Sequence, residues 1–122
     1  MKIKKIRWLP AEQAHDFPAA KSYLSLIYEK KRVSKMIARL RKAPVIEFKA
    51  KDIFRASRLS LLGVSNSHVE TDRVKIRKGE RLAPLLLVRD EFNGKVVIAD
   101  GYHRLCAIYE INEDAVISCR IV

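Results

Sequence analysis

Hydrophobic positions follow a helical spacing in the first third of the chain. Two apolar faces occur there. The first begins after Pro18 and consists of Ala20, Tyr23, Leu24, Ile27 and Tyr28. The second begins five residues after Tyr28 and consists of Val33, Met36, Ile37 and Leu40. The gap rotates the apolar face, because successive helical residues turn by about 100°. The pattern therefore predicts two helices in a hairpin, with a break between Glu29 and Arg32.

Shorter apolar runs flank this hairpin. The stretch Lys2 to Trp8 alternates basic and apolar residues, which predicts a short edge strand or an arm. After Pro44, the run from Val45 to Phe48 predicts a strand, and a helix is expected from Ala50 to Leu61, stopped by Gly63. The core residues expected in this region are Ile53, Phe54, Leu59, Leu61 and Leu62.

The second half alternates helix and strand signals. Ser67 and Glu70 have the spacing of a capping box, which predicts a helix running toward Lys78 and ending at Gly79. Three strands are expected, over residues 85–89, 96–99 and 115–122, with a helix between the last two. This order predicts an α+β (mixed α/β) fold with a small mixed sheet and helices before it.

Length and composition favour one folded domain over residues 1–122. The chain has 122 residues, of which 48% are hydrophobic, enough for one modest core. We expect a basic, mainly helical part over 1–63 and a helix-strand-strand-helix-strand part over 64–122. The basic start has no apolar run behind it and no segment could span a membrane, so a cytoplasmic protein without membrane partners is expected. Cys106 and Cys119 are expected to be buried and reduced. The spacing of the cysteines and histidines does not match a zinc-binding motif.

The positive charge is concentrated in the first half of the chain. Residues 1–60 contain 16 Lys and Arg against 5 Asp and Glu, whereas residues 61–122 contain 9 of each kind. This asymmetry favours a polyanionic partner, DNA or RNA first. Four basic residues line up opposite the apolar face of the second helix: Lys31, Lys35, Arg39 and Lys42. They are candidate phosphate-backbone contacts, but a solvated helix face has the same pattern, and a membrane-surface helix is disfavoured by the lack of large apolar residues.

The stretch VVIADGYHRL, residues 96–105, holds the candidate site. An apolar strand meets a helix at Gly101, which permits a tight turn and the close approach of a ligand. The start of that helix offers unpaired amide donors and partial positive charge, next to His103 and Arg104. The residues expected to bind a phosphate or nucleotide are Gly101, Tyr102, His103 and Arg104.

Each side chain of this stretch also has a structural interpretation. Asp100 could cap the helix, hold Mg²⁺ on a nucleotide phosphate, or accept a substrate proton. His103 could donate to a phosphate or act as an acid or base, or simply be packed. Arg104 matches phosphate bidentately, but a salt bridge to Asp100 or Glu80 would also satisfy it. Tyr102 could pack over a ligand or lie exposed.

The string ADGYHRLCA resembles the DGxHRLxA element of the ParB/sulfiredoxin-like superfamily. Its members include chromosome-segregation ParB proteins, ParB-like nucleases, sulfiredoxins and a free serine kinase, and the resemblance covers roughly His68 to Val122. It implies the fold of that superfamily and a nucleotide or phosphate site at the motif. Tyr102 occupies the place of the sulfiredoxin cysteine, which argues against sulfinic-acid repair. Similarity to the serine kinase implies phosphoryl transfer by Asp100 and an upstream glutamate, for which Glu70 is the candidate.

Three hypotheses follow from these observations. The first is a ParB-like domain that binds a nucleotide or phosphate and is associated with nucleic acid through its basic helices. The second is a phosphotransferase or nuclease that uses Asp100, His103 and Arg104 with a magnesium nucleotide. The third is an interaction module in which the motif only builds the turn between strand and helix. We expect the first, with the second as the alternative.

Overall fold

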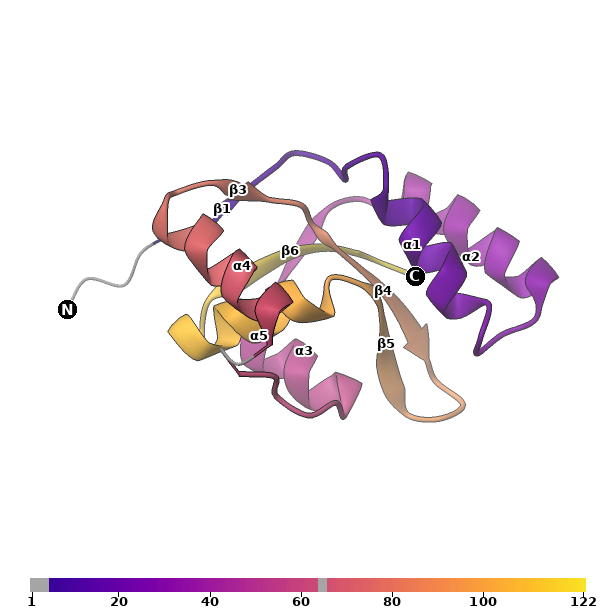
Figure 1. The fold of residues 1–122 in the computed structure, drawn as a ribbon. Coiled ribbons are helices and arrows are strands. Elements are labelled where there is room, and N and C mark those ends of the chain that lie inside the picture. Colours follow the sequence, from indigo (N-terminus) through magenta and orange to yellow (C-terminus); the bar gives the residue numbers. More distant parts are fainter. Residues whose placement is uncertain (1–4, 64–65) are drawn as a thin grey trace.

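The computed structural model describes residues 5–63 and 66–122, and its centre is a four-stranded mixed sheet (Figure 1). The strand order is β2-β6-β4-β5, which comprises β2 (Ile46–Lys49), β6 (Val116–Ile121), β4 (Leu85–Asp90) and β5 (Lys95–Asp100). Strand β4 runs parallel to β6, while the β2/β6 and β4/β5 pairs are antiparallel. The predicted α+β fold and the predicted mixed sheet are confirmed. Of the stretch Lys2 to Trp8, the positions before Lys5 lie outside the described residues.

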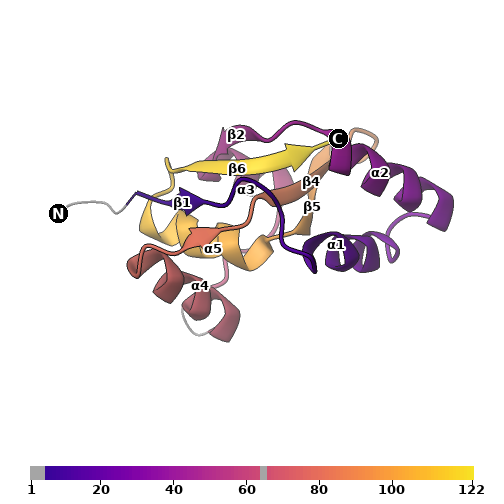
Figure 2. The ribbon, with the colours of Figure 1, turned by 90° about the horizontal axis from the view of Figure 1, so that it is seen from above.

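Helices cover both faces of the sheet (Figures 1 and 2). On one face lie α1 (Asp16–Leu24) and α2 (Lys30–Lys42), whose apolar residues form one core with β4 and β5. On the other face lie α3 (Ala50–Ser57) and α5 (Tyr102–Ile111), with α4 (Ser67–Arg77) packed against α5. The molecule is therefore layered as helices, sheet, helices, with α4 added outside α5.

Strand β4 shows why the sheet can be covered on both sides. Its side chains alternate, so Leu85 and Leu87 enter the core beneath α3 and α5, while Leu86 and Val88 enter the core beneath α1 and α2. All four are almost completely buried. A continuous apolar run is the expected sequence of a strand that is buried on both faces.

The predicted helical hairpin is confirmed, but its break comes earlier than expected. Helix α1 ends at Leu24, and the turn amides of Leu26 and Ile27 bond to the carbonyls of Tyr23 and Leu24. The chain therefore leaves the helix before Ile27, and Tyr23 and Ile27 are each 43% exposed instead of facing the core. These tight turn bonds satisfy the carbonyls at the end of the helix, which periodicity alone does not reveal.

Helix α3 is shorter than the sequence predicts. It ends at Ser57, because Arg58 adopts a left-handed conformation with φ of 58°. The Ser57 hydroxyl donates to the Phe54 carbonyl oxygen at 2.9 Å, which supplies a local end to the helix. Leu59 and Leu61 were expected in the core and are 38% and 45% exposed, so that prediction is wrong for both.

A two-stranded parallel sheet ties the start of the chain to the end of α4. It consists of β1 (Arg7–Trp8) and β3 (Arg81–Leu82). The strand expected in the first residues is thus confirmed at Arg7–Trp8. Gly79 follows α4 with a left-handed φ of 75°, and its amide bonds to the Ile76 carbonyl at 3.0 Å. The predicted stop at this glycine is confirmed.

The cap of α4 is Asn66, not Ser67. The Asn66 Oδ1 atom accepts from the amides of His68 and Val69 at 3.0 and 3.2 Å. The capping box predicted for Ser67 and Glu70 is therefore wrong, because asparagine one residue earlier is an equally good cap and begins the helix there. The Glu70 carboxylate is instead engaged by Arg73 and Arg77.

Replacing Asn66 with alanine should lower the free energy of unfolding by about 1 kcal/mol, because two amides of the first turn lose their acceptor. The matched control is Ser67→Ala, which removes the neighbouring hydroxyl. It should change stability by less than about 0.5 kcal/mol. Urea unfolding of the two variants measures both values, and a larger loss for Ser67→Ala would contradict this assignment of the cap.

Candidate functional site

The motif lies where β5 ends and α5 begins. Gly101 is the N-cap of α5 and has a φ of 106°, a conformation that residues with a side chain rarely adopt. A Cβ atom at this position would lie 2.6 Å from Leu85 Cγ and 2.9 Å from Arg104 Nη2. Glycine is therefore required both by the turn and by the close packing of these two side chains over it.

Arg104 is held across this turn by two acceptors. Its Nη2 atom donates to Asp100 Oδ2 at 3.1 Å and to the Pro84 carbonyl oxygen at 3.4 Å. The salt bridge to Asp100 that the sequence offered as an alternative is thus present, and its two side chains are only 15% and 16% exposed. The Arg104 Nε atom is buried and has no hydrogen-bond acceptor among the described residues. The Nη2 atom of the guanidinium is therefore held by two acceptors, whereas the buried Nε–H has none among the described residues.

A second carboxylate, which sequence reasoning missed, lies beside Asp100. Asp16, in the first turn of α1, is completely buried, and its Oδ2 accepts from the Gln13 amide at 2.8 Å. Burial raises the pKa of Asp100, the charge and hydrogen bond of Arg104 oppose that rise, and the nearby Asp16 carboxyl adds to it. The only sequence signal was an acidic residue close before Pro18, which also fits a simple helix start.

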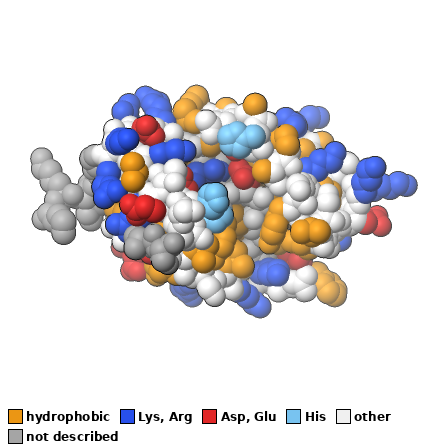
Figure 3. Space-filling model, in the orientation of Figure 1, with side chains coloured by type: hydrophobic (Ala, Val, Ile, Leu, Met, Phe, Trp, Pro, Cys, Tyr) orange, Lys and Arg blue, Asp and Glu red, His pale blue; other side chains and the backbone are white. Residues whose placement is uncertain are grey.

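Two histidine rings contact each other, tilted by 44°, beside the start of α5. The rings of His68, from α4, and His103, from α5, have centroids 4.9 Å apart. Partial burial lowers the pKa of His103, and the neighbouring His68 adds to this effect, whereas Asp72 opposes it. Figure 3 shows histidine, basic and acidic side chains close together near the middle of this face of the molecule. A neutral His103 imidazole can both donate and accept a hydrogen bond.

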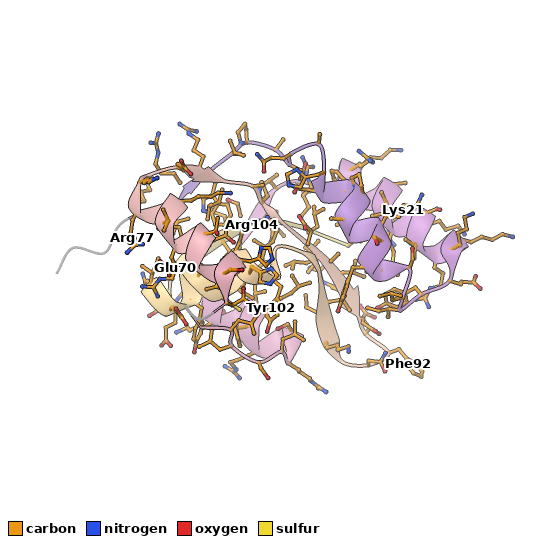
Figure 4. The ribbon with its side chains drawn as sticks, in the orientation of Figure 1. Lys21, Glu70, Arg77, Phe92, Tyr102 and Arg104 are labelled. Atoms are coloured by element: carbon orange, nitrogen blue, oxygen red, sulfur yellow. The ribbon has the colours of Figure 1, made fainter. Side chains whose placement is uncertain are left out.

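Tyr102 and Glu70 are placed away from Arg104. The Tyr102 hydroxyl donates to the Ser60 carbonyl oxygen and so fastens the segment after α3. Glu70 pairs with Arg77 at 3.2 Å, and Figure 4 shows Glu70 and Arg104 on opposite sides of α4. The structure thus brings together Asp100, His103 and Arg104 but does not add Glu70 to them.

Asp72 is the acidic residue of α4 that lies toward the motif. Burial raises the pKa of its carboxyl, and the charges of Arg104, Lys75 and His103 work against that rise. Asp72 is two positions from Glu70, and because a helix turns by about 100° per residue, the two side chains lie on opposite faces of α4. The rotation of α4 about its axis therefore decides which of them approaches the motif. Sequence spacing alone did not distinguish them.

A cavity of about 430 Å³ opens beside Arg104. It lies between the chain after β1, α4, and the segment around β3, and its lining includes Gln13, Asp72, Lys75, Arg81 and Arg104. Of the four residues predicted to bind phosphate, Arg104 lines this cavity, whereas Gly101, Tyr102 and His103 do not. Three cationic side chains, those of Lys75, Arg81 and Arg104, line it together with the carboxylates of Asp72 and Glu80. Small-ligand sites commonly have volumes of roughly 300 to 1,000 Å³.

The basic face predicted on α2 is exposed. Lys31, Lys35, Arg39 and Lys42 all point to solvent, and among the described residues no carboxylate forms a salt bridge with a Lys or Arg of α2. Two neighbouring arginines behave differently, because Arg32 lies over the Tyr28 ring and Arg41 over the Phe17 ring. Helix α2 lies at the end of the molecule away from α4 (Figures 1 and 2).

Comparison with protein-family models, curated protein sequences and solved structures finds no match for this chain. None of the helices that the structure describes is both long and apolar enough to cross a membrane. Across residues 5–63 and 66–122, no group of three or more His, Cys, Asp or Glu side chains is arranged to hold a metal ion. Magnesium commonly binds through one or two carboxylates together with substrate phosphates, so Asp100 fits it only as part of a magnesium nucleotide.

Proposed function

We propose that this protein binds a phosphorylated ligand, such as a nucleotide, at Arg104 and contacts DNA or RNA through the exposed face of α2. The first part depends on one observation, the buried Arg104 Nε atom without an acceptor. An unsatisfied buried donor is costly, and a charged one more so. An oxygen of a bound phosphate would satisfy it while the Nη2 atom stays on Asp100.

The surroundings of Arg104 support a phosphate more than an uncharged ligand. A guanidinium matches phosphate through paired donors, and Lys75 and Arg81 bring further positive charge to the same cavity. Asp72 and Glu80 on the lining would accept from hydroxyl or amino groups of the same ligand. This combination of anion-binding and hydrogen-bond-accepting groups suits a nucleotide or a phosphorylated metabolite.

A thermal-shift screen tests this proposal. Nucleotides and phosphorylated metabolites, each with and without magnesium, should include at least one compound that raises the melting temperature in a concentration-dependent way. Arg104→Lys keeps the charge but removes Nε, and it should abolish that increase. If the screen leaves the melting temperature of the native protein unchanged at every concentration, the phosphate site does not exist.

The proposed nucleic-acid contact predicts a specific salt dependence. Replacing Lys35 and Arg39 together with alanine should weaken binding to all duplex sequences alike and reduce the slope of log K against log salt by about 2. The matched control is Lys49→Ala with Arg55→Ala, which removes the same charge from other exposed positions. Fluorescence anisotropy with a labelled duplex measures both slopes. Equal slopes in the two double variants would show that α2 is only a solvated face.

An enzymatic role is the alternative that one observation favours. Asp100 has a raised pKa, a property common among catalytic carboxyls, and it contacts Arg104 at the edge of the cavity. In this alternative, Asp100 accepts a proton or binds Mg²⁺ with the nucleotide, and His103 serves as an acid or base. Asp100→Asn should then stop the formation of ADP or of cleaved strands, whereas turnover equal to that of the native protein ends the alternative.

The likeness of ADGYHRLCA to the ParB/sulfiredoxin-like motif supports the same proposal. Its glycine occupies the strand-to-helix turn at Gly101, and its arginine is the residue with the free donor. We therefore propose a relationship to that superfamily. Nucleotides and nucleic acids are cytoplasmic ligands, so the proposal also places the protein in the cytoplasm.

A further inference from the structure

Strand β2 is an uncovered end of the four-stranded sheet. It pairs only with β6, and no strand of the described residues lies along its other edge. Glu47, Phe48 and Lys49 of this strand are all exposed. At the opposite end of the sheet, β5 contacts both α1 and α3, and its residues 97–99 are buried. An uncovered edge presents main-chain donors and acceptors to which a further strand can bind.

The pairing with β6 determines which main-chain groups of β2 point outward. The Ala50 amide donates to the Ala115 carbonyl oxygen at 2.8 Å, and the β2/β6 register continues without a shift through Phe48. Hydrogen-bonded and non-hydrogen-bonded pairs alternate along an antiparallel ladder, so Phe48 directs its amide and carbonyl toward β6, as Ala50 does. The amides and carbonyls of Glu47 and Lys49 therefore point to the open edge.

The charges of Glu47 and Lys49 are complementary to those of a second, antiparallel copy of β2. Residues whose main-chain groups point outward must pair with one another. If each of these residues faced itself across the two-fold axis, like charges would lie directly opposite, which is destabilising. If Glu47 faces Lys49 of the second copy, opposite charges meet, and the two-fold axis repeats this pair. Among the described residues, neither side chain forms a salt bridge within its own chain.

Phe48 supplies the apolar contact of this register. Its side chain is 37% exposed, and with Ile53 and Ile121 it borders a cavity of about 260 Å³ beneath α3. When Glu47 faces Lys49, the Phe48 residues of the two copies form a non-hydrogen-bonded pair on the two-fold axis, where opposite side chains are closest. Aromatic pairs across strands stabilise a sheet. Main-chain, charge and apolar contacts therefore agree on one register.

We infer that two copies of this chain pair through antiparallel β2 strands, with Glu47 opposite Lys49, and join their sheets into one. The two-fold axis that relates antiparallel neighbouring strands is perpendicular to the sheet, so α1 and α2 of both copies lie on the same side of the dimer. The net charge of +11 on each copy opposes association, so dimerisation depends on protein concentration. This inference goes beyond the proposed function and does not rest on it.

Sedimentation equilibrium at protein concentrations up to millimolar tests this inference. The native protein should change from monomer to dimer as its concentration rises. Glu47→Lys and Lys49→Glu each convert both cross-strand pairs into like-charge pairs, so each should raise the dimer Kd by about tenfold or more. The double variant Glu47→Lys with Lys49→Glu restores opposite charges in the same register, and its Kd should return to within about threefold of the native value.

The matched control is Glu91→Lys, which changes the net charge as Glu47→Lys does, at an exposed position of the loop between β4 and β5. It should change the Kd by less than about threefold. Lys49→Glu lowers the net positive charge, so net charge alone would strengthen the dimer in that variant instead of weakening it. Circular dichroism verifies that the variants are folded, as their exposed positions predict.

A mixture of the Glu47→Lys and Lys49→Glu proteins adds a test of the register. Each protein alone places like charges opposite each other, but a pair of one and the other places opposite charges at both positions. The mixture should therefore form heterodimers at concentrations at which each protein alone is monomeric. A native protein that stays monomeric at every concentration overturns the inference. A native dimer whose Kd is unchanged in both single variants, or is not restored in the double variant, overturns it as well.

Discussion

Gly101→Ala should be among the most destabilising single substitutions in this protein, lowering the free energy of unfolding by about 2 to 5 kcal/mol. Two separate costs add at this residue. The φ of 106° lies outside the conformations open to alanine, and the new methyl group would lie 2.6 Å from Leu85 Cγ. Because Leu85 is completely buried in the core beneath α5, it has no room to move aside.

Gly79→Ala is the matched control for this prediction. Gly79 also has a positive φ, of 75°, but a Cβ atom there would meet nothing within 4 Å. Alanine at this position should cost only the left-handed conformation, about 1 to 2 kcal/mol. Urea unfolding with a constant m-value measures the two losses. Equal losses in the two variants would contradict the close packing of Leu85 and Arg104 over Gly101.

Arg104→Ala should lower the free energy of unfolding by about 3 kcal/mol or more at neutral pH, because it leaves the buried Asp100 carboxyl without its counter-charge. The Asp16 carboxyl, which is completely buried and already raises the pKa of Asp100, would add to this cost. Arg77→Ala is the control. It removes an arginine whose pair with Glu70 is largely exposed, and the expected loss is below about 1 kcal/mol.

The loss in Arg104→Ala should grow as the pH rises. Burial already raises the pKa of Asp100, and Arg104 lowers it, so removing the arginine raises that pKa further. A carboxyl with a raised pKa in the folded state binds more protons there than in the unfolded state, so it costs stability as the pH rises from the ordinary aspartate range through the raised value. Between about pH 4 and 8, the difference in the free energy of unfolding between Arg104→Ala and the native protein should therefore increase with pH. If that difference in the free energy of unfolding is the same at every pH, this role of Arg104 is contradicted.

Local sequence patterns predicted the elements of the fold but not all of their ends. The run VVIADGYHRL predicted a strand, a glycine turn and a helix, because strand periodicity and the conformational freedom of glycine are local properties. The ends of α1 and α3 were misplaced, since turn bonds after Leu24 and a left-handed Arg58 stop those helices. The cap of α4 moved by one residue because Asn66 and Ser67 are both good caps.

The candidate site was predicted only in the part that one segment of the chain supplies. Asp100, His103 and Arg104 lie within five residues, so a motif could identify them. Asp16 and Asp72 come close to the motif through the packing of α1 and α4, and no local sequence pattern predicts that residues so far apart in the chain come together. The sequence also could not decide which group Arg104 pairs with, because a carboxylate such as Asp100 and a phosphate both match a guanidinium.

The most direct measurement of the central claim follows the Arg104 Nε–H resonance in nitrogen-15 NMR spectra while inorganic phosphate is added. A phosphate oxygen that accepts from Nε should shift this resonance in a saturable way, together with the side-chain signals of Lys75 and Arg81 in the same cavity. Arg104→Lys should abolish saturable binding. If the Arg104 resonance stays in place while phosphate saturates another region of the protein, or saturates none, then Arg104 is only the counter-charge of Asp100.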